Sequence, residues 1–283
     1  MSELAALRRF YGEEIEAVSN LSSQRLIEAL ASVPRERFVG DGPWVVFGES
    51  AGPSARTTSD SDPRRVYHNY AIALDPGRQL FNGVPALIAS AIDRLQLQPG
   101  QRVLHVGTGT GYYTALIAHI VGPEGRVLGI EVDGDLATRA RHNLADQTWV
   151  SVEAGNARGP FDERFDAILV NAGVTHPEPA WLDAIETDGR IIMPLTATMP
   201  AMGTIGKGLL ILLTRQTDGA IAAQVLTFVA IYSALGLRDD ELNRRIGGAL
   251  QRNPFPRFTR LRRDAHDEGA SCWLHDAEWC LGN

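Results

Sequence analysis

Residues 103–114 read VLHVGTGTGYYT, an apolar run that ends in three glycines at alternate positions. A helical pattern of apolar residues follows at once, from Ala115 to Val121. This order predicts a buried strand, a tight glycine turn and then a helix. Because glycine has no side chain, a ligand can approach the backbone at such a turn, and the first turn of the helix offers free N–H groups. We therefore expect a loop that holds a nucleotide-like ligand.

The spacing of the glycines narrows the choice of nucleotide. The dinucleotide-binding fingerprint is G-x-G-x-x-G, whereas residues 107–111 read G-x-G-x-G. Twenty residues past Gly111 comes Glu131, which ends the run from Gly125. An acid at the end of the second strand can accept hydrogen bonds from both ribose hydroxyls. Alone, Glu131 could be a solvated strand-end carboxylate, but turn, strand and acid in this order favour a ribose contact.

The composition is that of a globular chain. Its 283 residues are 44% hydrophobic and 22% charged, enough for one large core with or without an appendage. A net charge of −7 gives no electrostatic support for nucleic-acid binding. No apolar run reaches the ~18 residues of a membrane span, and no secretory signal is visible. We therefore expect a cytoplasmic protein with neither a nucleic acid nor a membrane as its partner.

Strands and helices alternate through the middle of the chain. The pattern predicts further strands over 149–154, 165–170 and 189–195, and helices over 133–144 and 181–185. Such alternation is typical of a parallel sheet with helices on both faces. Two more β-rich runs, 208–214 and 222–232, flank Asp218-Gly219, which is a hairpin signal. We therefore predict an α/β fold, a doubly wound and mostly parallel seven-stranded sheet with an antiparallel hairpin.

The flanking regions are less regular. Residues 1–39 show helical spacing, and Pro85 suits the first turn of a helix over 86–95. Glycine, proline and small polar residues dominate 40–63, which we expect to be a loop that is either disordered or covers a site. Residues 234–283 are polar and irregular, with one predicted helix over 238–250.

The order of these motifs resembles the protein-L-isoaspartate O-methyltransferase family of class I S-adenosyl-L-methionine (SAM) methyltransferases. The G-x-G-x-G turn is similar to motif I of that class. The resemblance runs from about Val33 to Leu235 and also involves VPRERFV at 33–39, VGPEGRV at 121–127, FDAI at 165–168 and GRIIMPL at 189–195. It implies a SAM-dependent transfer of a methyl group to the carboxylate of isoaspartate, a step that initiates the repair of aged proteins.

The resemblance also implies an arrangement of parts and a cofactor site. We expect N-terminal helices and a substrate-side loop over 1–85, a SAM-binding domain over 86–235, and an extension over 236–283 that makes the chain a divergent paralogue. The glycines would shape the methionine side, Glu131 would hold the ribose, Asn156 and Ala157 would border adenine, and Asn171 would lie where the acceptor enters. The full predicted set is His105, Gly107, Thr108, Gly109, Gly111, Tyr112, Glu131, Val132, Asn156, Ala157 and Asn171.

Two positions depart from the family pattern. Family members carry a serine that contacts the substrate carboxylate region, and in this sequence Asn82 takes its place within Leu80–Pro85. The usual Gly-Asp-Gly after the third strand is Gly155-Asn156-Ala157, so the adenine side lacks a charge. The resemblance therefore supports the family's fold and cofactor for this chain. It supports the isoaspartate substrate poorly. The acceptor could be a protein, a peptide or a small-molecule carboxylate.

A carboxylate acceptor is ionised near pH 7, so its methylation needs no general base, whereas an amine or hydroxyl acceptor would need one. The candidates for catalysis or substrate contact are Asn82, His68 and His176. Each histidine could be a base, a substrate contact or a solvated loop residue. Tyr67 and Tyr70 could wall the pocket or belong to the core.

The C-terminal residues raise a separate question. His266, Cys272, His275 and Cys280 lie within fifteen residues. Zinc could bind such a set, but the spacing is not a standard motif, and two cysteines are no disulfide framework. The sequence favours ordinary packing of Trp273, Leu274 and Trp279 over zinc or a disulfide, and we predict no metal.

Two other functions remain open at this point. The domain could bind SAM and serve as a recognition or adaptor module without turnover, which the asparagine at position 82 favours. A nicotinamide oxidoreductase is disfavoured by the glycine spacing.

Overall fold

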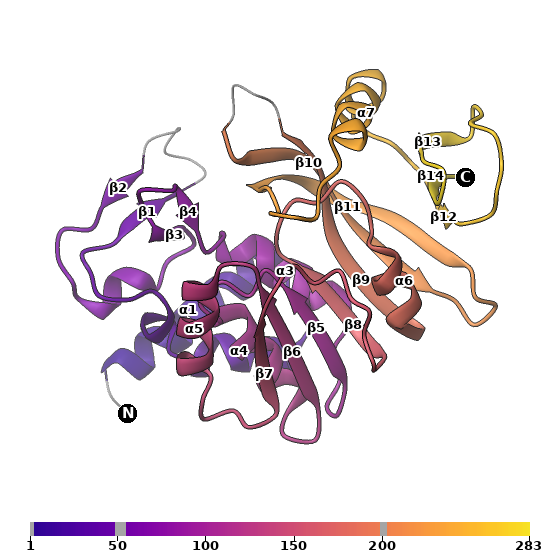
Figure 1. The fold of residues 1–283 in the computed structure, drawn as a ribbon. Helices are drawn as coiled ribbons and strands as arrows, with labels where there is room; N and C mark the ends of the chain where they lie inside the picture. The colour runs from indigo at the N-terminus through magenta and orange to yellow at the C-terminus, as the bar shows by residue number, and fades with distance from the viewer. Residues whose placement is uncertain (1–2, 49–54, 199–202) are drawn as a thin grey trace. The chain divides into compact units, whose positions relative to one another are not determined.

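A computed structural model describes residues 3–48, 55–198 and 203–283. The chain folds into two compact units, Met1–Gly155 and Asn156–Asn283, drawn from indigo to yellow in Figure 1. Among the described residues, no helix combines the length and the apolar character that crossing a membrane requires.

The first unit begins with the helices predicted within residues 1–39. They are α1 (Glu3–Ser19), α2 (Gln24–Ser32) and the short 3-10 helix η1 (Arg35–Phe38). Helices α1 and α2 pack closely at Gly12, where a Cβ would lie 3.3 Å from the backbone of Ala31. Helix α2 ends before Pro34, because proline disfavours a helical conformation in the residue that precedes it.

A small antiparallel sheet follows, with strand order β2-β1-β3-β4. Its strands are β1 (Val45–Phe47), β2 (Arg56–Thr57), β3 (Ala71–Asp75) and β4 (Leu80–Phe81), and the 3-10 helix η3 (Pro63–Val66) precedes β3. The prediction of a loop over 40–63 was wrong for β1 and β2. Strands of two or three residues are too short to show an alternating pattern. Residues 49–54 of that predicted loop lie outside the described residues.

The rest of the first unit is the predicted strand–turn–helix repeat. Strands β5 (Arg102–Val106), β6 (Arg126–Glu131) and β7 (Val150–Ala154) pair in parallel. The helices are α3 (Pro85–Leu95), α4 (Tyr112–Val121) and α5 (Gly134–Asn143). Nearly all of α4 is buried, which explains why its apolar residues show no polar face.

The second unit contains the other predicted strands. Strands β8 (Phe165–Val170) and β9 (Ile185–Thr198) pair in parallel, with α6 (Pro179–Ala184) between them in sequence. Strands β10 (Ile205–Arg215) and β11 (Ile221–Tyr232) form an antiparallel hairpin that also pairs with β9. The turn lies at Asp218-Gly219 as predicted, and Gly219 has a φ of +84°. The predicted α/β fold class is therefore confirmed, with its seven strands as β5 to β11.

The C-terminal extension is more regular than its sequence indicates. After α7 (Asp240–Arg252) come β12 (Arg260–Arg262), β13 (Cys272–His275) and β14 (Cys280–Gly282). They continue the sheet beyond β11 in the order β11-β12-β14-β13. The expectation of irregular structure after the helix was wrong, because strands of three or four residues have no readable period. Of the three residues predicted to pack, Leu274 and Trp279 are buried and Trp273 is half-buried, so their packing is confirmed for two of the three.

Candidate functional site

The glycine turn between β5 and α4 has the backbone conformation that only glycine adopts without strain. Gly107, Gly109 and Gly111 have φ values of +80°, +58° and +99°. Gly111 caps α4, and a Cβ there would lie 2.8 Å from Cδ1 of Leu144. The positive φ values favour glycine at all three positions, and at Gly111 the close approach of Leu144 is a second reason.

Glu131 ends β6 directly beside this turn. Its Oε2 accepts a hydrogen bond from the N–H of Gly109 at 2.7 Å, and its Oε1 accepts one from the N–H of Asp133 at 3.1 Å. The side chain is only 7% exposed. Burial raises the pKa of this carboxyl group, and the backbone N–H donors counteract that effect.

These residues fit a nucleoside. Each carboxylate oxygen of Glu131 accepts one backbone hydrogen bond and retains capacity to accept another, so the pair can bind a vicinal diol. The next residue, Val132, is 44% exposed, which is unusual for a valine that follows a buried strand. The carboxylate of Glu131 is suited to the ribose hydroxyls of an adenosyl group, and the exposed side chain of Val132 is suited to its adenine base.

The β3–β4 hairpin lies against the glycine turn. Cδ1 of Leu74 would be 3.4 Å from a Cβ at Gly109. Arg78, in the hairpin loop, forms ion pairs with Asp75 and with Asp133, both at 2.7 Å. Asp133 is also the N-cap of α5. The hairpin is thus tied to the residues that surround Glu131.

Asn82 follows the same hairpin and has an unpaired donor. Its backbone N–H donates to the carbonyl of Ile72 at 2.9 Å, and its Oδ1 accepts from the N–H of Ile72 at 2.8 Å. Among the described residues nothing accepts a hydrogen bond from its buried Nδ2. Buried polar atoms normally have partners, so this amide is a candidate contact for an acidic ligand.

Arg35 has a structural role that its sequence motif does not reveal. It is fully buried and donates hydrogen bonds to the carbonyls of Val66, His68 and Tyr70 at 2.7, 2.8 and 2.8 Å. This cation therefore holds the segment that carries His68, whose side chain is exposed. Tyr67 and Tyr70 are buried, which places both rings in the core.

Three predicted cofactor residues support the turn from inside. His105 is fully buried, and its Nδ1 lies 2.8 Å from Oγ1 of Thr114. Burial lowers the pKa of His105 to about 3, so the ring is neutral. Thr108 donates to the carbonyl of His105 at 3.2 Å, and Tyr112 is buried. Their contribution to cofactor binding stays a prediction.

Four predicted residues belong to the second unit. Asn156 is exposed and Ala157 is buried, with the carbonyl of Ala157 accepting a 2.8 Å hydrogen bond from Nε1 of Trp181. Asn171 directly follows β8. His176 has its Nε2 3.2 Å from Oε1 of Glu178. Their roles also stay predictions.

The family model for Protein-L-isoaspartate(D-aspartate) O-methyltransferase matches residues 57–207. A protein-L-isoaspartate O-methyltransferase of Methanothrix thermoacetophila is 29% identical over 230 residues, which cover 80% of this chain and 96% of the relative. A Rhodopseudomonas palustris relative named protein-L-isoaspartate O-methyltransferase 2 is 31% identical over 179 residues, which cover 62% of this chain and 71% of the relative.

Solved structures show the same fold. A Plasmodium falciparum chain, described as a protein-L-isoaspartate O-methyltransferase in complex with S-adenosyl-L-homocysteine, superposes with a TM-score of 0.60 at 18% identity, covering 80% of this chain and 97% of that one. A second structure, described as a protein-L-isoaspartate O-methyltransferase, gives a TM-score of 0.58 at 18% identity and covers 98% of this chain and 88% of that one.

Proposed function

This chain belongs to the protein-L-isoaspartate O-methyltransferase family, and from that premise we propose that it transfers a methyl group from SAM to an isoaspartyl carboxylate of a protein or peptide. The observation that carries the proposal is the junction of Gly109 and Glu131, because a buried carboxylate beside a glycine turn is suited to bind an adenosyl group. Family membership decides against a nicotinamide oxidoreductase.

The chain's contribution begins with holding the cofactor. The three glycines of the turn present backbone without side chains. Glu131 would accept hydrogen bonds from the ribose hydroxyls, and Val132 would contact the base. When bound, SAM supplies an electrophilic methyl group on a sulfonium. The protein then has to bring the acceptor oxygen into line with that methyl group, which is a matter of orientation.

Asn82 is our candidate for that orientation. An isoaspartyl carboxylate is ionised at neutral pH, so no side chain has to remove a proton from it. What the carboxylate needs is a hydrogen-bond donor that fixes one oxygen, and the buried Nδ2 of Asn82 is such a donor. His68 and His176 are then candidates for substrate contact, not for general-base catalysis.

One observation favours a second candidate function, SAM binding without turnover. Asn82 replaces the serine expected in this family, and its Oδ1 is already engaged by the N–H of Ile72. A residue with a backbone role of this kind could have lost its role toward substrate. The two functions differ only in whether a methyl group leaves the cofactor.

A methyl-transfer assay separates them. SAM labelled in its methyl group is incubated with the full chain and a peptide containing isoaspartate, and a peptide of the same sequence with ordinary aspartate is the control. Transfer to the isoaspartyl peptide alone supports the proposed enzyme. Calorimetric binding of SAM without transfer to either peptide supports the second function, and the absence of SAM binding contradicts both.

A further inference from the structure

Four side chains that commonly ligate metals meet in the C-terminal extension: His266, Cys272, His275 and Cys280. Their potential ligand atoms all lie within 4.8 Å of one another. Both cysteines are free thiols. We propose that these four residues bind one zinc ion in a closed structural site that holds the extension together.

The separations are close to those of a tetrahedral site. Sγ of Cys272 lies 3.5 Å from Nε2 of His266 and 4.0 Å from Nδ1 of His275. With Zn–S bonds of about 2.3 Å and Zn–N bonds of about 2.0 Å, neighbouring ligand atoms lie roughly 3.3–3.8 Å apart in a tetrahedron. Side-chain adjustments of a few tenths of an ångström would therefore suffice.

The backbone explains how β13 brings two ligands to one side. Cys272 and His275 are three residues apart, so in a regular strand their side chains would point to opposite faces. The pairing of β13 with β14 shifts register between Cys272 and Leu274, which marks a bulge, and His275 is directly opposite Cys280. Bulges re-aim side chains in this way.

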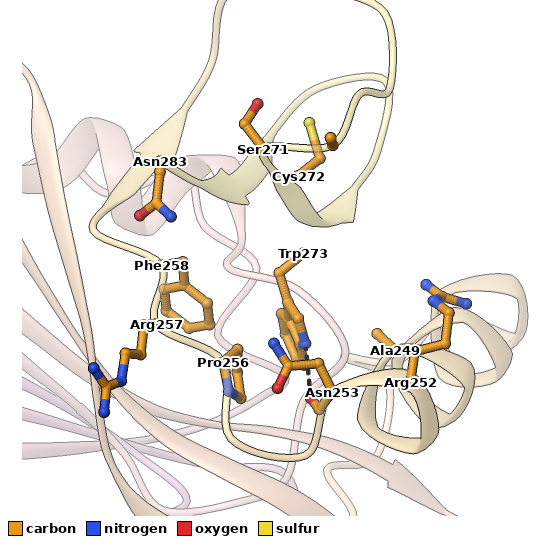
Figure 2. A pocket seen from close by; sticks show the side chains of 11 residues that line it. Ala249, Arg252, Asn253, Pro256, Arg257, Phe258, Ser271, Cys272, Trp273 and Asn283 are labelled. Carbon is orange, nitrogen blue, oxygen red and sulfur yellow. Dashed lines mark hydrogen bonds between the residues drawn. The ribbon is translucent and has the colours of Figure 1, made fainter.

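Figure 2 shows the consequence at the start of β13. The sulfur of Cys272 and the ring of Trp273 point in opposite directions from the strand. Trp273 packs on Phe258, with ring centroids 5.4 Å apart, and its Nε1 donates to the carbonyl of Asn253 at 3.2 Å. Trp273 therefore packs one side of β13 against the rest of the second unit. The other side of the strand carries Cys272, which belongs to the proposed zinc site.

His266 is held in the orientation that a metal ligand needs. Its Nδ1 lies 2.8 Å from the backbone carbonyl of Asp264. A carbonyl oxygen only accepts, so Nδ1 carries a proton, and in the neutral ring Nε2, which lies 3.5 Å from Sγ of Cys272, has the free lone pair that a metal needs. Asp264 is fixed in turn by Arg262, whose Nε donates to its Oδ1 at 3.0 Å.

The donor set indicates the metal and its role. Two thiolates and two imidazoles suit zinc, and two thiolates neutralise its charge. Four protein ligands leave no open position for substrate or water, so the role is structural. The site would connect three parts of the chain: the irregular loop that precedes β13, strand β13 and strand β14. These two strands are only four and three residues long. Short elements of this kind commonly need such a crosslink.

The proposal is tested by measuring the zinc content of the full chain, purified without a polyhistidine tag. We expect one zinc per chain after exhaustive desalting. The double variant Cys272→Ser/Cys280→Ser should lose that zinc. The matched control is His142→Gln, which removes an exposed histidine of α5 outside the cluster and should retain one zinc per chain.

A second measurement keeps the proposal testable if the double variant fails to fold. Cobalt added to the metal-free, unsubstituted protein should give the visible bands of tetrahedral cobalt and a thiolate-to-cobalt charge-transfer band, and zinc should abolish both. A cobalt spectrum of hexaaqua or octahedral type would overturn the proposal. So would a Cys272–Cys280 disulfide found by mass spectrometry in protein purified under reducing conditions. Methyl transfer is not a readout here, so the outcome is independent of the proposed function.

Discussion

The backbone N–H of Gly109 donates a 2.7 Å hydrogen bond to the carboxylate of Glu131, which is 22 residues further along the chain. This bond joins the glycine turn after β5 to the end of the adjacent parallel strand β6. It orients a buried acid whose two oxygens each retain capacity to accept a further hydrogen bond. The geometry therefore makes Glu131 part of the turn, and its removal should affect the ligand more than the fold.

The first prediction follows from this geometry. Glu131→Ala should abolish SAM binding measured by calorimetry, while the far-UV circular dichroism spectrum stays that of the unsubstituted protein. Two hydrogen bonds from ribose hydroxyls to a carboxylate contribute about 1.5–3 kcal/mol each, so the affinity should fall by at least two orders of magnitude. Glu131→Gln, which keeps the shape and loses the charge, should bind SAM with intermediate affinity.

Glu153 is the matched control for Glu131. It stands opposite Ile130 on the neighbouring strand β7 and is exposed. Glu153→Ala removes a strand-end acid of the same kind without touching the glycine turn, so SAM affinity should change by less than twofold. Unchanged SAM affinity in Glu131→Ala would refute the assignment of Glu131 to the ribose.

The sequence predicts a structural element well where that element is long. It also predicts a functional residue well where that residue directly follows such an element in the chain. Strand β8 occupies the predicted residues 165–170, because six consecutive residues are enough for an apolar run to stand out. Glu131 was found for a similar reason, since the end of an apolar strand can be recognised. Strands β12 to β14 were missed because three or four residues carry no periodicity.

Long-range contacts explain why the role of Arg35 was missed and why the His266–Cys280 set was left undecided. The partners of Arg35 lie 31 to 35 residues away and are backbone carbonyls, so no residue type in the sequence marks them. The spacing from His266 to Cys280 matches no standard motif, and the bulge that aligns Cys272 with His275 depends on pairing with β14. Only coordinates bring such groups together.

The second prediction concerns Arg35. Arg35→Met keeps much of the volume but leaves three carbonyls without their donor, two of them in buried hydrogen bonds, and each unsatisfied buried group costs about 1–3 kcal/mol. We expect a loss of about 3 kcal/mol or more in the free energy of unfolding, measured with urea. Arg37→Ala is the control, because its ion pair with Asp146 is exposed and such pairs contribute about 0–1 kcal/mol. Equal effects of the two substitutions would contradict the role given to Arg35.

The third prediction is a pH dependence caused by His105. In the unfolded chain this histidine titrates near a pKa of about 6.5, whereas burial lowers its pKa to about 3 in the folded protein. Between these values the unfolded state binds one more proton, so the free energy of unfolding falls as pH is lowered. One proton corresponds to about 1.4 kcal/mol per pH unit.

Urea unfolding between about pH 7 and about pH 5 measures this slope. Other groups contribute to it, so the comparison is with His105→Asn, which cannot take up a proton and retains a group able to hydrogen-bond Thr114. The slope should be smaller in this variant by up to one proton. His142→Asn, which changes an exposed histidine of α5, is the matched control. A slope that is the same in all three proteins would show that His105 is not kept neutral by the fold.

The last prediction tests Asn82 as the residue that orients the acceptor. Asn82→Asp keeps an oxygen for the N–H of Ile72 and replaces the unpaired Nδ2 donor by a second acceptor. The substituted side chain would repel a substrate carboxylate where the amide would bind it. We expect kcat/KM for an isoaspartyl peptide to fall by about 100-fold or more, the equivalent of about 2.7 kcal/mol. SAM affinity should remain close to that of the unsubstituted protein. Asn82→Ser, which restores a hydroxyl donor, should retain more activity than Asn82→Asp. If Asn82→Asp methylates the peptide at the unsubstituted rate, the amide does not contact the acceptor, and its buried Nδ2 needs another explanation.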